Sequence, residues 1–195
     1  MVSRSAMKKS TSNSNDRGRT SIRAGSAAGS TTLLLLSLAG ISTSYAQSEG
    51  FFTGLKGHSE VPPISSPGIG SFQATLSGDN IGLKYELTYI NLRGTVSQAH
   101  IHFAQPGVNG AVVVFLCSNL TPPEGVPAPP ACPGSGTVSG SLGATNVTSL
   151  AADQGISAGQ FDALLAAMRA GRAYVNVHTD LFPAGELRGQ VEAGP

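Results

Sequence analysis

The 195-residue sequence contains no tryptophan, only two cysteines and few charged side chains. Charged residues make up 12% of the chain, and Lys and Arg together number 12. Proteins that bind nucleic acid present a basic surface with exposed aromatic rings, which this composition does not supply. The longest apolar run also falls short of the ~20 residues that a membrane-spanning helix needs. We therefore expect neither a nucleic-acid partner nor a membrane span in the mature protein.

The motifs of two common enzyme classes give no support for catalysis either. The one Gly-x-Ser-x-Gly match, GISAG at residues 155–159, lies in a chain of mostly β-type runs, whereas hydrolases use this elbow in an α/β fold to expose a nucleophilic serine. No glycine-rich phosphate loop opens a helix. A catalytic role is therefore not the leading interpretation, and the sequence predicts no catalytic residues.

The first 46 residues are typical of an export signal. Basic residues precede the apolar segment TTLLLLSLAGIS, and the small-residue segment SYA lies just before Gln47. We predict cleavage after Ala46, which leaves a domain of residues 47–195; Met7 is an alternative start because the basic segment is unusually long. That domain holds six Lys and Arg against ten Asp and Glu, a net charge of −4. We expect it to be secreted, to the periplasm or outside the cell.

The two cysteines, Cys117 and Cys132, flank the proline-rich segment SNLTPPEGVPAPPA. Proline cannot donate a backbone hydrogen bond, so this segment is expected to be a loop. In an oxidising compartment the thiols are expected to form a disulfide, which contributes about 3 kcal/mol in the loop-entropy estimate. A metal-binding thiol pair is the alternative, although the chain has no Cys-x-x-Cys spacing.

Most of the predicted domain consists of short β-type runs separated by Gly, Asn, Asp and Pro. Their spacing predicts an all-β fold, an antiparallel sandwich or flattened barrel of about eight strands. The predicted strands are 51–57, 69–77, 81–91, 97–104, 111–118, 135–142, 173–179 and 185–192.

One segment, SAGQFDALLAAMRAG, has the spacing of an amphipathic helix instead. Its apolar residues fall on one helical face: Phe161, Leu164, Leu165 and Met168. Ser157 with Gln160 forms a capping box, and Gly171 lies where a left-handed C-cap is expected. We therefore predict a single helix, about residues 157–170, packed on the sheet with this face in the core.

Two of the four histidines lie one residue apart in the predicted strand 97–104. Successive side chains of a strand point to opposite faces. The apolar face consists of Ala99, Ile101 and Phe103. His100 and His102 therefore point away from the core, with Cα atoms about 6.6 Å apart, a separation from which two imidazoles can converge on one ion.

Strand 173–179 repeats this alternation, with its valines inward and His178 outward. If the two strands share a sheet, three imidazoles meet on its outer face. Imidazole suits copper and zinc, and bare affinity favours Cu(II) among divalent ions. Asn176 or Asp180 would then hold a ring in its tautomer. The alternative is that His100 and His102 are ordinary polar residues on the solvent-exposed face of a sheet, and that His178 caps a turn.

Several segments resemble the CHRD domain, a module named for its repeats in chordin and also found singly in secreted bacterial proteins. They are LKGHSEVPPISSPGIGSFQATL, AHIHFAQPGVNGAVVVFL, SAGQFDALLAAMRAGRA and AYVNVHTDLFPAGELRGQV. The resemblance covers nearly all of residues 51–192. It implies an exported all-β domain without catalysis, a binding or structural module whose partner is an extracellular or envelope protein or a matrix component.

A weaker resemblance bears on the histidines. An HxH strand followed by a VxVH strand is similar to the copper-ligand pattern of Cu/Zn superoxide dismutase, a Greek-key β-sandwich with its copper outside the barrel. It implies a Greek-key fold and copper ligation by His100, His102 and His178. Because no histidine lies between the second and third of these, the bridging histidine and the zinc site have no counterpart, and dismutase activity is not expected. A fourth ligand would come from His58, water or a carboxylate.

Two charged residues of the last predicted strand belong to the same candidate site. Glu186 and Arg188 lie two residues apart and so share one strand face. They are expected either to form an ion pair near the histidines or to be an exposed surface pair worth under about 1 kcal/mol.

Overall fold

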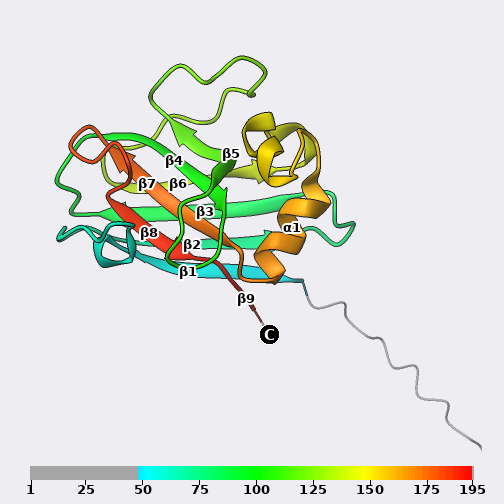
Figure 1. Cartoon of the computed structure of the whole chain (residues 1–195), viewed down its shortest axis with the longest axis horizontal. Helices are drawn as coiled ribbons and strands as arrows, with labels where there is room; N and C mark the ends of the chain where they lie inside the picture. The colour runs from blue at the N-terminus through cyan, green and yellow to red at the C-terminus, as the bar shows by residue number, and fades with distance from the viewer. Residues whose placement is uncertain (1–47, 195) are drawn as a thin grey trace, which may run out of the picture. The chain divides into compact units, whose positions relative to one another are not determined.

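The computed structural model describes residues 48–194, and the predicted export signal at residues 1–46 lies outside that range. The described chain folds into strands, three short 3-10 helices and one α-helix (Figure 1). In chain order these are β1 (Gly50–Lys56), η1 (Gly57–Ser59), β2 (Ile69–Leu76), β3 (Leu83–Ile90), β4 (Val96–Phe103), β5 (Ala111–Ser118), β6 (Gly136–Leu142), η2 (Ala144–Asn146), η3 (Ser149–Gln154), α1 (Phe161–Arg169), β7 (Ala173–Thr179), β8 (Leu187–Gln190) and β9 (Glu192–Ala193).

The strands form one antiparallel sheet in the order β5-β4-β7-β8-β1-β2-β3-β6, and β9 pairs with β1. Because β3 lies beside β6 and β4 beside β7, the chain crosses between non-consecutive neighbours in a Greek-key arrangement. The two ends of this order approach each other, and the hydroxyl of Tyr85 on β3 donates a hydrogen bond to the carbonyl of Leu116 on β5. The sheet is therefore a nearly closed, flattened barrel, which confirms the predicted fold class.

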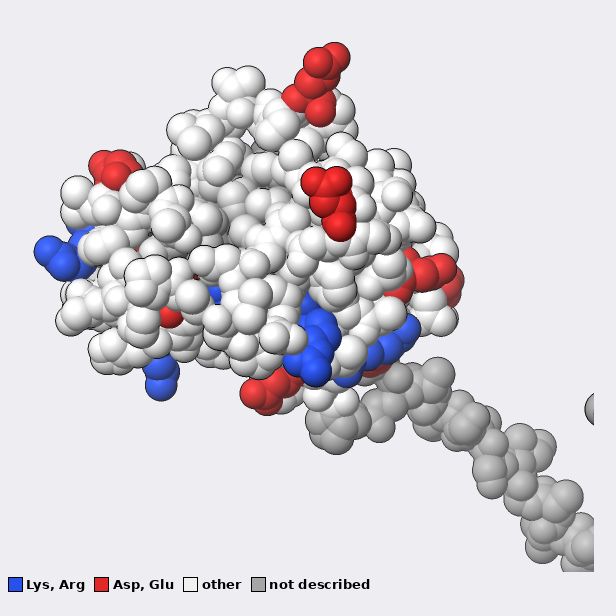
Figure 2. All heavy atoms as spheres, viewed as in Figure 1, with Lys and Arg blue, Asp and Glu red and all other residues white. Residues whose placement is uncertain are grey.

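The core lies inside the barrel and follows the two-residue period of the strands. On β3 every second residue is buried: Leu83, Tyr85, Leu87 and Tyr89. The residues between them face outward, and Lys84 and Glu86 are exposed. On the face drawn in Figure 2 most charged side chains are scattered, and where several meet, at the lower right, both signs are present rather than a patch of one sign.

Helix α1 contacts β7 and β9 at one end of the strands (Figure 1). Its predicted apolar face is buried in the core cluster. The helix begins at Phe161, four residues later than predicted, because Gly159 has a left-handed φ of +84° that a right-handed helix cannot contain. The predicted end is confirmed: Gly171 has φ +63°, and the Arg172 N–H donates to the carbonyl of Ala167 at 2.8 Å, as in a Schellman motif.

The last predicted strand, 185–192, is divided in the structure. β8 covers only its middle and pairs with both β7 and β1, and the two-residue β9 pairs with β1 alone. Gly185 precedes β8 with a φ of +128°, outside the range of an extended strand. The strand therefore begins later than predicted, is interrupted at Val191, and keeps only β1 as a neighbour at its end.

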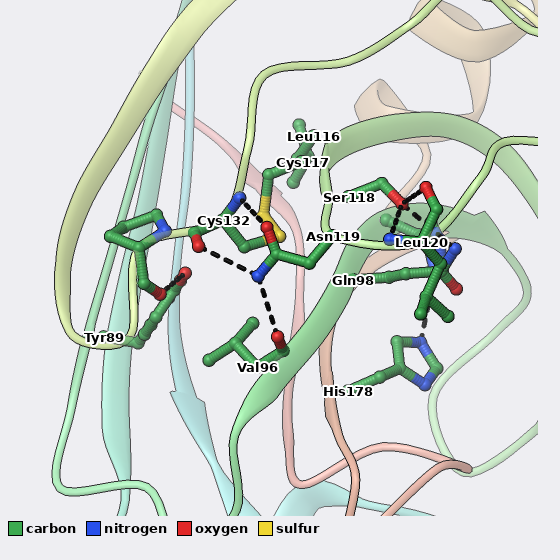
Figure 3. The surroundings of a disulfide bond; sticks show 12 residues. Tyr89, Val96, Gln98, Leu116, Cys117, Ser118, Asn119, Leu120, Cys132 and His178 are labelled. Carbon is green, nitrogen blue, oxygen red and sulfur yellow. Dashed lines mark hydrogen bonds between the residues drawn. A yellow bond between two sulfur atoms is a disulfide. The ribbon is translucent and has the colours of Figure 1, made fainter.

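Cys117 and Cys132 form a disulfide, as predicted, with Cα atoms 5.0 Å apart. The alternative of a metal-binding thiol pair is therefore wrong. The side chain of Asn119 donates to the carbonyls of Val96 at 2.9 Å and Cys132 at 3.0 Å (Figure 3). The disulfide and this asparagine together fix the base of the proline-rich loop to strand β4. No helix in the described residues is long and apolar enough to cross a membrane.

Candidate metal centre

The pairing of β4 with β7 brings the three predicted histidines together. In this register Gln98 is opposite His178 and His100 is opposite Asn176, so His100 and His178 are diagonal neighbours on one face. The ring centroids of His100 lie 5.4 Å from His102 and 4.9 Å from His178. The third separation, between His102 and His178, is 6.0 Å. All three imidazoles therefore lie on the outer face of the sheet, the face predicted from the two-residue period of the strands.

These rings are on the outside of the barrel, yet two of them are buried and the third, His178, is half-buried. The side chains of His100 and His102 belong to residues only 4% and 7% exposed. The ring of Phe115 meets His100 edge-on with centroids 4.4 Å apart, and the ring of Tyr174 stacks on His102 at 4.6 Å. The alternative of a solvent-facing polar face is therefore wrong for His100 and His102, whereas the half-buried His178 lies beside the β7–β8 loop.

Hydrogen bonds to backbone carbonyls assign the tautomers of two rings. Nδ1 of His102 lies 3.0 Å from the carbonyl oxygen of Gly110, and Nδ1 of His178 lies 3.0 Å from that of Pro183. A carbonyl oxygen can only accept, so in both rings Nδ1 carries the proton and Nε2 keeps a free lone pair. Outer partners of this kind orient metal-ligating histidines in many proteins.

His100 adds the third imidazole to this cluster. Its Nδ1 is 3.1 Å from Nε2 of His178, which has no proton, so Nδ1 of His100 is the donor of this hydrogen bond. The Nε2 atoms of His100 and His102 are buried and have no hydrogen-bond partner. Each unsatisfied buried polar atom costs about 1–3 kcal/mol.

The electrostatic surroundings keep all three rings neutral. Burial lowers the pKa of His100 to about 2 and that of His102 to about 4. Burial also lowers the pKa of His178, against the opposing effect of its hydrogen bond to Pro183. At neutral pH the three imidazoles therefore present lone pairs rather than positive charge, which is the protonation state that a metal ion requires.

The spacing of the ring nitrogens is close to that of ligands on one ion. Two imidazole nitrogens at about 2.0–2.1 Å from a tetrahedral ion are about 3.3 Å apart. The nitrogens of His100 and His178 are already 3.1 Å apart, and one ligand atom from each histidine lies within 4.8 Å of the others. Ring movements of about 1 Å would place all three on one ion. His100 offers Nε2 directly, or Nδ1 once its proton has moved to Nε2.

The support for His102 comes from a stack that sequence reasoning missed. The guanidinium of Arg188 lies 3.4 Å from the ring centroid of Tyr174, on which His102 stacks. The same guanidinium donates to the side-chain oxygen of Asn109 at 2.8 Å and to the carbonyl of Val108. These hydrogen bonds hold the β4–β5 loop at Val108 and Asn109. The residue that follows them, Gly110, supplies the carbonyl that orients the ring of His102.

The two residues predicted to orient the histidine rings, Asn176 and Asp180, bind other groups instead. The Asn176 amide donates to Oε1 of Glu60 at 2.7 Å, and Asp180 accepts from the Thr95 N–H at 2.8 Å. Burial raises the pKa of Glu60 to about 7, against the opposing effects of Arg188 and Asn176. The ring partners are instead backbone carbonyls, for which a sequence carries no residue-type signal.

Neither expectation for the last two charged residues is correct. Glu186 and Arg188 are 0% and 2% exposed, so they are not a surface pair. They also do not bind each other, because Glu186 accepts hydrogen bonds from four other groups: the Ser66 and Thr179 hydroxyls and the N–H groups of Arg93 and Gly94. Burial raises the pKa of Glu186, but these hydrogen bonds outweigh it and leave the pKa lowered.

The remaining candidate, His58, lies on η1 and is exposed. It is not part of the histidine cluster. Within the described residues the cluster therefore consists of three imidazoles, without the fourth protein ligand that the sequence left open.

A Greek-key barrel with a covered histidine cluster on its outer face defines the class of this protein as an all-β domain with a candidate metal centre. The family model of the CHRD domain matches residues 51–191. The chain therefore belongs to the CHRD domain family. No curated protein and no solved structure matches it.

Proposed function

We propose that this CHRD domain is an exported binding module that holds one copper or zinc ion through His100, His102 and His178. The observation that carries the proposal is the pair of buried Nε2 atoms without partners on two of these rings. Buried polar atoms in folded proteins are almost always satisfied. A bound ion would satisfy lone pairs that the protein itself leaves unpaired.

A purely structural histidine cluster is the competing explanation. In such a cluster each ring would be expected to pair both nitrogens, because an unpaired one reduces stability. Here two rings depart from that expectation: His100 and His102 each leave a buried Nε2 without a partner, while carbonyls hold the Nδ1 atoms of His102 and His178. Metal-ligating histidines commonly donate the N–H of their other ring nitrogen to a neighbouring carbonyl or carboxylate in this way, which fixes the orientation of the ring.

Export is the second part of the proposal. The disulfide between Cys117 and Cys132 supports it, because disulfides persist in oxidising compartments. The predicted signal at residues 1–46 supports it independently. In such a compartment the metal would be acquired outside the cytoplasm.

Elemental analysis tests the metal site. Protein recovered after export from cells expressing the full chain, without a histidine tag, is offered copper or zinc and then passed through a desalting column. We expect one ion per chain in the parent and in His58→Ala, whose exposed histidine lies outside the cluster. We expect none in His100→Ala or His178→Ala. A parent that retains less than a tenth of an equivalent of either metal would end the proposal.

Partner binding through the proline-rich loop is a second candidate function. The base of this loop is fixed by the disulfide and by Asn119, whereas Leu120 on the loop is 55% exposed. A fixed base and an exposed apolar side chain suit contact with an extracellular or envelope protein or a matrix component. Such binding should survive the change of all three clustered histidines to alanine and be weakened by Leu120→Ser. Loss of binding in the triple histidine variant, with binding unchanged in Leu120→Ser, would indicate that the partner binds the histidine face instead.

A further inference from the structure

We propose that the three-histidine site is selective for Cu(I) over Cu(II) and Zn(II). This inference deepens the proposed function and rests on it. Three features of the site carry it: the ligands are neutral, the site is buried, and the charged group closest to it in the stack of rings is a cation. Each feature disfavours a doubly charged ion more than a singly charged one.

The first feature is the composition of the ligand set. The ligand atoms that come together in the described chain belong to imidazoles alone. Imidazole binds a metal in its neutral form, so the charge of the occupied cluster equals the charge of the ion. Buried charges in proteins are normally compensated by a paired group. A divalent ion here would have no carboxylate or thiolate ligand to compensate it.

The second feature is burial. His100 and His102 are nearly inaccessible, and the rings of Phe115 and Tyr174 pack against them. The cost of moving an ion out of water rises with the square of its charge, so it is about four times larger for a divalent ion than for a monovalent one. Water can therefore do little to offset the missing ligand charge.

The third feature is the cation above the site. Arg188 is 2% exposed, and its guanidinium lies 3.4 Å from the ring centroid of Tyr174, which stacks on His102. Its repulsion of a bound ion is proportional to the charge of that ion. A buried cation is screened less by salt than a surface charge would be.

The buried acids near these strands do not ligate the cluster. Glu60 hydrogen bonds to Asn176, and Glu186 is occupied by hydroxyls and backbone N–H groups. Neither belongs to the group of side chains whose ligand atoms come together. Both carboxylates therefore act at longer range than the three imidazoles.

The number of ligands points in the same direction. Zn(II) in proteins is usually four-coordinate, and Cu(II) prefers a square arrangement of at least four ligands. His58, the fourth histidine of the chain, is exposed and outside the cluster. Cu(I), with a filled d shell and a single charge, is stable with three nitrogen ligands, which is the number present.

Competition titrations test the selectivity. The metal-free exported protein is titrated anaerobically with Cu(I) against bicinchoninate, and separately with Cu(II) against nitrilotriacetate and Zn(II) against a zinc-binding dye. We expect one equivalent of Cu(I) to bind, with a Kd at least about 100-fold below those of Cu(II) and Zn(II). His58→Ala is the control for adventitious binding at an exposed histidine and should behave like the parent.

The outcomes separate this inference from the proposed function. One equivalent of Cu(II) or Zn(II) bound as tightly as Cu(I) would overturn the selectivity and leave the metal site standing. If none of the three ions binds stoichiometrically, the proposed function fails as well.

Arg188 allows the charge argument to be tested by itself. Arg188→Gln removes the cation, and Arg188→Lys keeps it; circular dichroism and thermal unfolding report whether each variant is folded. We expect the ratio of the Cu(II) and Cu(I) dissociation constants to fall about tenfold in Arg188→Gln and less than about threefold in Arg188→Lys. Equal ratios in both folded variants would overturn the role of the guanidinium, and if neither folds, the parent titration decides.

Discussion

The barrel has two outer faces that differ in burial, although their strands alternate in the same way. Over β2, β3 and β6 the outward side chains are largely exposed and bind one another, as Gln73 does with Glu86 and Thr88 with Thr137. Over β4, β7 and β8 the outward side chains include His100, His102, Tyr174, Asn176 and Arg188, all buried. Alternation therefore shows which side of a strand faces the core, but not whether the other side meets water.

The connecting loops cause this difference. β2 and β3 are joined by a short turn in which Asn80 has a left-handed φ of +61°, and nothing in this turn returns over the sheet. The β4–β5 and β7–β8 loops instead supply the carbonyls of Gly110 and Pro183 to the histidine rings. These loops thus provide hydrogen bonds that the polar side chains of the covered face need, while the rings of Phe115 and Tyr174 pack against His100 and His102.

The largest expected effect comes from Gly110→Ala, because the added Cβ would displace the β4–β5 loop. A Cβ at Gly110 would lie 1.9 Å from the carbonyl oxygen of Phe103, so the β4–β5 loop must move in Gly110→Ala. We expect the free energy of unfolding to fall by more than about 3 kcal/mol and metal retention to be lost. Chemical denaturation and elemental analysis measure the two effects.

Gly54→Ala is the matched control, because a Cβ there would meet nothing within 4 Å. It should change the free energy of unfolding by less than about 1 kcal/mol. Equal effects of the two substitutions would show that the loop does not hold the covered face together.

A pH-dependent effect is expected next, from the buried carboxyl of the covered face. Burial raises the pKa of Glu60 to about 7, so between pH 4.5 and 7 the folded state binds more protons than the unfolded state. Stability from this group is thus complete below about pH 4.5 and is lost as the pH rises to about 7, by about 2–3 kcal/mol.

The measurement is the free energy of unfolding of the parent and of Glu60→Gln at several pH values. The side-chain amide of glutamine cannot ionise. The free energy of unfolding of Glu60→Gln should therefore rise relative to that of the parent as the pH increases from 4.5 to 7. Glu86→Gln, on the exposed face, is the control for a general loss of negative charge. A difference between parent and Glu60→Gln that is constant from pH 4.5 to 7.5 would contradict the burial argument.

The same comparison explains what the sequence could predict. The barrel, the disulfide, the apolar helix face and the common side of the three histidines all follow from period, spacing and compartment, which are properties of residue types. The burial of His100, the carbonyl of Pro183 that orients His178, and the stack of Arg188 on Tyr174 depend on where loops return. Backbone carbonyls look alike at every position of a sequence, so this part of the site required the fold.

A smaller effect is expected from replacing an unsatisfied ring by an apolar side chain. His100 has a buried Nε2 without a partner, and the ring of Phe115 packs against it. In His100→Leu the free energy of unfolding of the metal-free protein should change by less than about 1 kcal/mol, because the unsatisfied Nε2 is removed while Nε2 of His178 loses its donor. The increase in Tm that copper or zinc gives to the parent should disappear.

Thermal unfolding with and without metal distinguishes the two explanations of the cluster. A ring kept for metal binding reduces the stability of the metal-free protein, whereas a ring kept for structure adds to it. Loss of more than about 1 kcal/mol in metal-free His100→Leu would favour the structural explanation.

The smallest expected effect belongs to the exposed face. The hydroxyls of Thr88 and Thr137 are 2.8 Å apart on paired strands, and the contact is solvent-exposed. In a double-mutant cycle of Thr88→Ala and Thr137→Ala the coupling should be about 0.2–0.5 kcal/mol, with metal retention unchanged, because water replaces either lost hydroxyl. A coupling above about 1 kcal/mol would mean that this face is desolvated in solution as the histidine face is, and the contrast between the two faces would no longer hold.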